Sequence, residues 1–306
     1  MILCCGEALV DMLPRETPGG ENAFAPFAGG AVFNTAIALG RLGAPASFFS
    51  GISTDLFGRL LQDALAESRV DTSLVKTSDR PTTLAFVTLT NGQASYAFYD
   101  ENTAGRMLDP TDVPVLPDDV NAVFFGGISL VVEPCARAYE SLMLAEAGRR
   151  VLMLDPNVRP GFIRDEAAYR ARIERMIAAA DILKVSDEDL AWLSGAGSLS
   201  DGAATMLKKG PALVLVTEGA KGAHGFTESL SVEVPARAVE VVDTVGAGDT
   251  FNAGVLAALD LHGHLTRDGL RRLDEAAVRQ AISLGSRAAA VTVSRAGANP
   301  PWAREL

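Results

Sequence analysis

The chain has 306 residues, of which 48% are hydrophobic and 21% are charged, a composition typical of a folded globular protein and not of a disordered one. Its formal net charge is −11, from 27 Lys and Arg against 38 Asp and Glu. No broad basic surface is therefore expected, and nucleic acid is not predicted as a partner.

The longest uncharged stretch, residues 22–40, is interrupted by proline, glycine and asparagine, and no basic segment of a signal peptide follows Met1. No membrane association is therefore expected. The three cysteines include the adjacent pair Cys4 and Cys5 and show neither zinc-ligand spacing nor an even disulfide framework. These features predict a protein of the reducing cytoplasm.

Short apolar runs alternate with longer helical patterns along most of the chain. Strands are expected within residues 1–10, 46–52, 122–131, 150–155, 181–186 and 212–219, with helical patterns such as 33–43 and 55–69 between them. This alternation predicts a doubly wound α/β domain with a mostly parallel sheet flanked by helices.

Two segments interrupt this alternation and predict a small β-flap. Residues 11–28 are rich in proline and glycine, and residues 82–100 alternate in polarity around the Asn-Gly pair at 91–92, which is typical of a hairpin. Further along, "GISTDLFGRLL" places Ser53, Thr54 or Asp55 where a helix N-cap is expected.

The N-terminal third contains two motifs with polar residues in apolar surroundings. "GEALVDMLP" contains Asp11, whose carboxylate could accept charge-assisted hydrogen bonds from a ligand or simply lie in a turn. "AGGAVFNTAIALGRLG" pairs Gly29 with Gly30 and places Asn34 on an apolar helical pattern. An asparagine there can bind vicinal hydroxyls or bond to buried backbone, and both interpretations stay open.

Three later segments follow expected strands. "LDPNVRP" contains Arg159, whose guanidinium could bind an anion through two parallel hydrogen bonds, although its Asp-Pro pair is also typical of a turn. "ILKVSDEDL" contains Lys184 and a run that could equally be a solvated acidic helix start, and "LVTEGAKGA" could be a plain hairpin connection.

The segment "DTVGAGDTFNAG", residues 243–254, is the strongest indication of chemistry. Residues 239–242 read as a strand and the residues after 248 as a helix, so the glycines lie at a strand-to-helix turn whose amides can bind an anion. Asp249 would repel that anion unless it receives a proton from a group that attacks it, so a general base is predicted. The alternative is tight packing with a helix-dipole carboxylate.

Two other glycine motifs are excluded at this turn. A dinucleotide fingerprint lacks its third glycine, and a P-loop lacks a lysine before Thr250.

Taken together and in this order, these motifs resemble the ribokinase-like (PfkB) carbohydrate kinases over nearly the whole chain. The resemblance implies a single ribokinase-like α/β domain over residues 1–306, with a small β lid inserted from about 11–28 and 82–107. It further implies that Asp249 is the catalytic base and that Gly246, Ala247 and Gly248 surround the γ-phosphate.

The same resemblance assigns expected binding roles. The sugar is expected at Asp11, Gly29, Gly30, Asn34, Phe98 and Arg159, and the nucleotide at Lys184, Ser186, Thr217, Gly219 and Gly222. The family commonly has Asn and Glu near Mg²⁺ where this chain has Ser186 and Asp189, so the expected metal residues are Glu188, Asp189 and Asp243. Residues 290–298, with the Asp243 region, are expected to bind a monovalent cation such as K⁺.

Residues 96–108, 155–160 and 184–190 resemble fructokinases more than ribokinases or adenosine kinases. The implied reaction is transfer from ATP, with Mg²⁺, to the 6-hydroxyl of fructose. A 2-dehydro-3-deoxygluconate kinase, in which Arg159 or Arg106 would bind the acid, or another PfkB sugar or nucleoside kinase, is the alternative.

A sugar sensor without turnover also stays open, and so does an NAD-dependent oxidoreductase, although no dinucleotide turn follows the first strand. Exposed flap edges would favour a homodimer through the lid.

Overall fold

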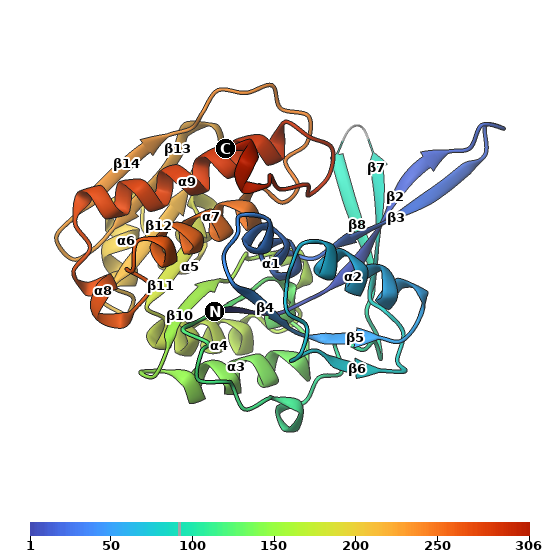
Figure 1. The fold of residues 1–306 in the computed structure, drawn as a ribbon, viewed down its shortest axis with the longest axis horizontal. Helices are drawn as coiled ribbons and strands as arrows, with labels where there is room; N and C mark the ends of the chain where they lie inside the picture. Colours follow the sequence, from blue (N-terminus) through green and yellow to red (C-terminus); the bar gives the residue numbers. More distant parts are fainter. Residues whose placement is uncertain (91–92) are drawn as a thin grey trace.

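The protein is described by a computed structural model over residues 1–90 and 93–306, so the expected Asn-Gly turn lies outside the described residues. Within these ranges, the central sheet has eight strands in the order β14-β13-β12-β11-β10-β9-β1-β4 (Figure 1). The strands are β1 (Ile2–Cys5), β4 (Ala46–Phe49), β9 (Ala122–Gly126), β10 (Val151–Asp155), β11 (Ile182–Ser186), β12 (Leu213–Thr217), β13 (Gly222–Phe226) and β14 (Ser231–Pro235).

The strands from β4 to β12 in this order are parallel, and β13 and β14 are added antiparallel at one edge. Ile2 of β1 pairs with Ala46 on one side and with Ala122 on the other, so β1 has a parallel neighbour on each side. Every residue of β1, β4, β9 and β10 is buried, because helices cover both faces of the sheet. The predicted doubly wound, mostly parallel α/β fold is confirmed.

Two helical layers enclose the sheet, and each has its own hydrophobic core. One layer contains α1 (Ala31–Arg41), α2 (Leu56–Glu67), α7 (Ala247–Leu261), α8 (Arg267–Arg271) and α9 (Glu275–Val293). The other contains α3 (Cys135–Glu146), α4 (Glu166–Ala179), α5 (Asp187–Ser194) and α6 (Leu199–Leu207). Short 3₁₀ turns occur at η1 (Pro110–Asp112), η2 (Ile128–Leu130), η3 (Pro160–Phe162), η4 (Gly219–Lys221) and η5 (Ala303–Glu305).

A second sheet projects from the body of the molecule (Figure 1). Its strands are β2 (Leu9–Glu16), β3 (Asn22–Gly29), β7 (Leu84–Thr90) and β8 (Gln93–Tyr99), in the order β3-β2-β7-β8. β7 and β8 are antiparallel, as the alternating pattern predicts, and β2 is parallel to β7. A short parallel pair, β5 (Gly51–Ser53) and β6 (Lys76–Ser78), lies near its base.

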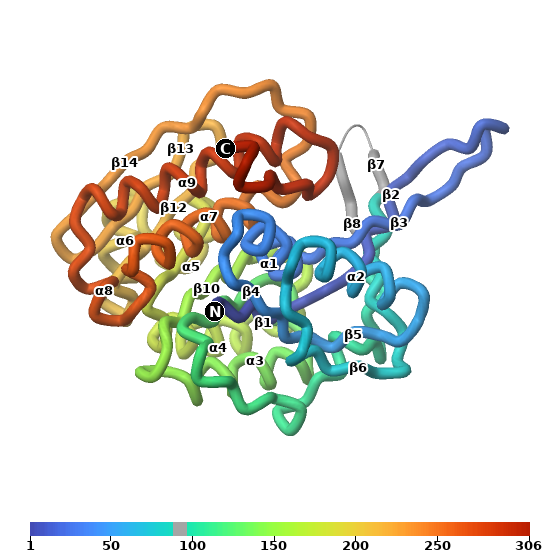
Figure 2. The backbone as a smooth tube through the Cα atoms, in the orientation of Figure 1, coloured from blue at the N-terminus to red at the C-terminus, as the bar shows by residue number. Residues whose placement is uncertain are grey.

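Two local predictions can be compared directly with the structure. Asp55 is the N-cap of α2, where its carboxylate accepts a 2.7 Å hydrogen bond from the amide of Gly58, as expected. The expected strand at 239–242 is wrong, because this segment joins no ladder and Val241 and Val242 are each 60% exposed. Figure 2 follows the segment as part of the orange connection to α7. Its valines favour a strand, but the segment pairs with no strand and no core covers these two side chains. The amide of Val242 donates a 2.8 Å bond to the carbonyl oxygen of Val293, at the end of α9.

No helix among the described residues combines the length and the apolar character that crossing a bilayer requires.

Candidate active site

The carboxyl ends of the parallel strands bring several predicted residues to one edge of the central sheet. Asp155 ends β10, Ser186 ends β11 and Thr217 ends β12, and the last two are paired in register. Ligands of open α/β sheets bind beyond this edge, because the strand ends and the following helix termini converge there. The glycine turn before α7 belongs to the same region of the molecule.

Gly246 is the N-cap of α7 and has a left-handed conformation with φ of 77°. No described side chain caps this terminus. The amide of Ala247 donates a 3.4 Å bond to the carbonyl oxygen of Thr244, so among the first amides of α7 those of Gly248 and Asp249 stay available to an anion. A Cβ at Gly246 would lie 2.7 Å from Cβ of Ala298, which explains why the turn requires glycine. The first helical turn then contains Ala247, Gly248 and Asp249.

Asp249 is 9% exposed, and burial raises the pKa of its carboxyl to about 7. Its Oδ2 accepts a 2.9 Å hydrogen bond from Nδ2 of Asn34, and its backbone carbonyl accepts a 3.2 Å bond from Oγ1 of Thr35. Both partners lie on α1, so one helix orients the side chain and the backbone of Asp249. A carboxyl with a pKa near neutrality can exchange a proton with a bound hydroxyl.

Glu7 was not predicted from sequence, yet it determines where α1 begins. Its carboxylate accepts hydrogen bonds from the amides of Ala31 (2.8 Å) and Ser129 (3.3 Å), and burial raises its pKa. Gly30 has φ of 110°, and a Cβ there would lie 2.8 Å from the carbonyl oxygen of Glu7. The sequence contained one signal for a buried role of Glu7, which is an acid between two apolar runs in "GEALV".

The projecting sheet carries two of the expected sugar-binding residues, Asp11 and Phe98, in one cross-strand row. In this row Asp11 pairs with Phe27 and Ala85, and Ala85 pairs with Phe98. A Cβ at Gly29 would lie 2.2 Å from Oδ2 of Asp11, so only glycine leaves room for this carboxylate. Burial raises the pKa of Asp11 to about 6.

Phe98 also connects the projecting sheet to the loop after β10. Its ring meets that of Phe162 edge to face at a centroid distance of 4.8 Å. Arg159, in the same loop, is exposed, and its guanidinium donates a 3.0 Å bond to the carbonyl oxygen of Val158. In this conformation its side chain therefore extends into solvent.

A buried ion pair lies beside the α7 turn. Oδ2 of Asp155 accepts hydrogen bonds from Nζ of Lys184 (2.9 Å) and Nδ2 of Asn252 (2.7 Å). A Cβ at Gly248 would lie 3.1 Å from that Nζ, so the ammonium lies against the anion-binding turn. Sequence reasoning singled out Lys184 but missed Asp155, which reads as a turn residue, and Asn252, which lies inside an apolar helix.

The expected metal residues do not converge. Ser186 and Asp189 form a capping box at the start of α5, Asp189 is buried and Glu188 is exposed. The carboxylate of Asp243 instead accepts bonds from the amides of Val245 (3.0 Å) and Gly297 (2.9 Å). Within the described ranges, no cluster of three or more Asp, Glu, His or Cys has metal-site geometry.

The loop after β12 contains the expected nucleotide residues Thr217, Gly219 and Gly222. Oγ1 of Thr217 donates a 3.5 Å bond to the carbonyl oxygen of Val185. Gly219 and Gly222 have φ of 55° and 122°, and a Cβ at Gly222 would lie 2.3 Å from the carbonyl oxygen of Val234. Gly222 is therefore required by the turn, whereas the space beside Gly219 is open.

Comparisons with known proteins agree with this geometry. A family model described as pfkB family carbohydrate kinase matches residues 1–304. The chain is 56% identical over 279 residues to a fructokinase of Rhizobium leguminosarum bv. trifolii, covering 91% of this chain and 86% of the relative.

Two solved structures extend the similarity to three dimensions. A fructokinase from Xylella fastidiosa is similar with a TM-score of 0.86 at 30% identity, covering 99% of this chain and 96% of the other. A fructokinase double mutant from Vibrio cholerae O395, in fructose, ADP and potassium ion bound form, is similar with a TM-score of 0.85 at 26% identity. The match covers 97% of this chain and 93% of the other.

Proposed function

Because the chain belongs to the pfkB family of carbohydrate kinases, we propose that it transfers the γ-phosphoryl group of ATP to the 6-hydroxyl of fructose. The observation that carries the proposal is the position of Asp249, a buried carboxyl with a pKa of about 7 at the uncapped start of α7. The similarity to several fructokinases supports fructose as the acceptor.

Asp249 acts as the general base. Its carboxylate takes the proton of the 6-hydroxyl while that oxygen bonds to the γ-phosphorus and the bond from this phosphorus to the bridging oxygen breaks. ADP leaves with that bridging oxygen. The amides of Gly246, Ala247 and Gly248 and the α7 dipole stabilise the transferred phosphoryl group, and the Lys184 ammonium beside Gly248 adds a full positive charge.

Fructose binds between the projecting sheet and α1. Asp11 and Asn34 bind sugar hydroxyls, and Gly29 and Gly30 lie beside them in the sugar site. A Cβ at either glycine would collide with Oδ2 of Asp11 or with the carbonyl oxygen of Glu7. The row that contains Phe98 covers the sugar as a lid and excludes water, which limits ATP hydrolysis. Arg159 rotates from its solvent position towards the substrate when the lid closes.

ATP lies over the carboxyl ends of β11 and β12, where Lys184, Ser186, Thr217, Gly219 and Gly222 line its path. The open space beside Gly219 suits close approach of the nucleotide to backbone. Mg²⁺ neutralises phosphate charge when it is bound. The described side chains form no protein cage for it, so phosphate oxygens and water would supply most of its ligands, and Glu188 and Asp189 would be the protein carboxylates near it.

A monovalent cation is proposed at the loops joined by Asp243 and Gly297, because one similar fructokinase contains potassium. Replacing K⁺ by tetramethylammonium should then lower turnover.

The exposed Phe24, Phe27 and Tyr99 of the lid support a homodimer through this sheet, which sedimentation would detect. The buried free thiols Cys4, Cys5 and Cys135 support a cytoplasmic location.

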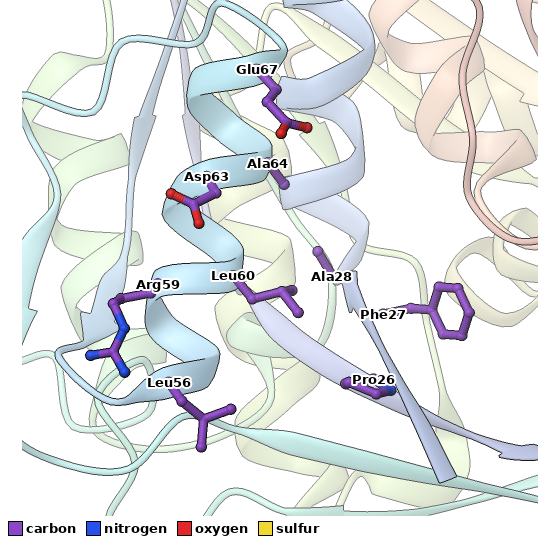
Figure 3. A pocket seen from close by; sticks show the side chains of 9 residues that line it. All are labelled: Pro26, Phe27, Ala28, Leu56, Arg59, Leu60, Asp63, Ala64 and Glu67. Atoms are coloured by element: carbon purple, nitrogen blue, oxygen red, sulfur yellow. The ribbon is translucent and has the colours of Figure 1, made fainter.

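The projecting sheet, which is the proposed lid, has two faces with different surroundings. Pro26 and Ala28 face α2, where a groove of about 580 Å³ lies, while the ring of Phe27 points away from that helix (Figure 3). Phe27 also lines this groove, but its ring points to the same side of the sheet as Asp11, with which it is paired.

A panel of fructose, other hexoses, 2-dehydro-3-deoxygluconate and nucleosides, each with Mg-ATP, tests the function directly. We expect ADP formation to be fastest with fructose. A large preference for the sugar acid or a nucleoside would contradict the assignment, and sugar binding without turnover would indicate a sensor. No binding of a nicotinamide cofactor is expected.

A further inference from the structure

We propose that Asp155 is a positioning residue that holds the Lys184 ammonium against the phosphate side of the α7 turn and prevents it from pairing with Asp249. The inference rests on the proposed kinase function and extends it to a residue outside the predicted site. It explains how a cation and a free carboxylate base can lie close together without neutralising one another.

The ion pair is fully enclosed. Asp155 is 3% exposed and Lys184 is 5% exposed. Lys184 donates to Oδ2 of Asp155 at 2.9 Å, and Asn252 donates to the same oxygen at 2.7 Å. The other oxygen, Oδ1, accepts a 3.2 Å bond from the amide of Asn157. Three donors therefore keep the Asp155 carboxylate in one orientation.

A buried ion pair is costly to form, so this arrangement needs a reason other than stability. The position of the ammonium supplies that reason, because Nζ of Lys184 lies 3.1 Å from the point where a Cβ at Gly248 would be. Gly248 directly precedes Asp249, so without Asp155 the nearest strong acceptor for Lys184 on α7 is the Asp249 carboxylate. A direct pair there would lower the basicity of Asp249 and withdraw the cation from the phosphate.

Charged groups from several elements act on Asp249. Asp155 on β10 and Glu7 after β1 raise its pKa, and Lys184 on β11 lowers it. The hydrogen bond from Asn34 on α1 also lowers it. Removing Asp155 and removing Lys184 must therefore shift the titration of Asp249 in opposite directions, which a merely structural role would not produce.

The test is a ¹³C NMR titration of aspartate-labelled full-length protein, with the Asp249 signal assigned by its loss in Asp249→Asn. In Asp155→Asn we expect the Asp249 midpoint to fall by about one pH unit or more, and in Lys184→Met to rise. The turnover of Lys184→Met should fall about 100-fold or more. An unchanged midpoint in Asp155→Asn, or shifts of the same sign in both variants, would overturn the proposal.

If either single variant fails to fold, Asp155→Asn/Lys184→Met removes both charges together and avoids an unpaired buried charge. Its Asp249 midpoint should lie between those expected for the single variants, with turnover about 100-fold lower. Turnover within threefold of the parent would refute the role of the pair.

Asp181→Asn is the matched control, because Asp181 pairs with Arg267 at the opposite end of β11. It should leave the Asp249 midpoint unchanged. The NMR readout needs no sugar, so failure of this proposal is distinguishable from failure of the fructokinase assignment.

Discussion

The side-chain amide of Asn34 donates a 2.9 Å hydrogen bond to Oδ2 of Asp249, a residue 215 positions further along the chain. Asn34 lies on the helix that receives the returning lid strand, and Asp249 lies on the helix that starts at the anion-binding turn. This bond therefore connects the helix beside the proposed sugar site to the turn that is proposed to hold the phosphate. It also holds the carboxylate in the orientation that the proposed base requires.

Asp249→Asn should lower kcat by about 10²–10⁴ while fructose and ATP still bind, because the amide keeps the shape and removes the base. Coupled measurement of ADP formation and calorimetric binding check the two halves of this expectation. Asp260→Asn, on the same helix but away from its start, is the control and should turn over normally. Near-normal turnover of Asp249→Asn would rule out the base assignment.

The pH dependence of kcat/KM should show an acidic limb near pH 7, since Asp249 must be ionised and burial raises its pKa to about 7. Asn34→Leu removes a hydrogen bond that lowers this pKa, so the limb should move to higher pH. Initial rates between pH 5 and 9 at low fructose measure both profiles. A limb that stays in place in Asn34→Leu would contradict the coupling.

Asp249→Asn should also stabilise the protein, by about 2–4 kcal/mol at pH 8. An acid whose pKa is raised in the folded state binds more protons folded than unfolded, so the parent loses stability as pH rises from about 4 to about 7. The substitution removes this loss, so its effect should vanish near pH 4 and be complete above pH 7. Urea unfolding at both pH values measures it, and an equal effect at both would exclude this origin.

Gly246→Ala should lower kcat by at least about tenfold and destabilise the protein by about 1–3 kcal/mol. The new Cβ would meet Ala298 at 2.7 Å, in addition to the strain of a φ of 77°. Gly263→Ala is a matched control with φ of 72° and open space around its Cβ, so it carries only the backbone strain. Equal losses in the two variants would mean that the contact with Ala298 has no effect.

Asp11→Asn should raise the KM for fructose more than it lowers kcat, because the charged hydrogen-bond acceptor for the sugar is lost. The pKa of Asp11 is about 6, so fructose binding by the parent should weaken as pH falls below that value. Calorimetric titration of fructose at pH 5 and pH 8 measures this. An affinity that does not change with pH would argue against a role for the ionised carboxylate.

Part of this structure was predictable because local patterns alone dictate it. Apolar runs such as 150–155 form parallel strands, and alternating residues in 82–100 form β7 and β8. The glycines around Asp249 indicated an anion-binding helix start before any coordinates. The roles assigned to individual residues stay predictions, because they depend on bound sugar and nucleotide.

The alternation of elements, the glycine turn and the acid beside it could be read from local patterns alone, since periodicity and backbone conformation depend on near neighbours. Packing in three dimensions was needed to show that 239–242 stays outside the sheet, that Glu7 caps α1 and that Asp155 accepts hydrogen bonds from both Lys184 and Asn252. These outcomes depend on which strand ends meet at one edge of the sheet. Contacts between segments that are distant in sequence carry no local pattern, so they emerge only when the chain packs.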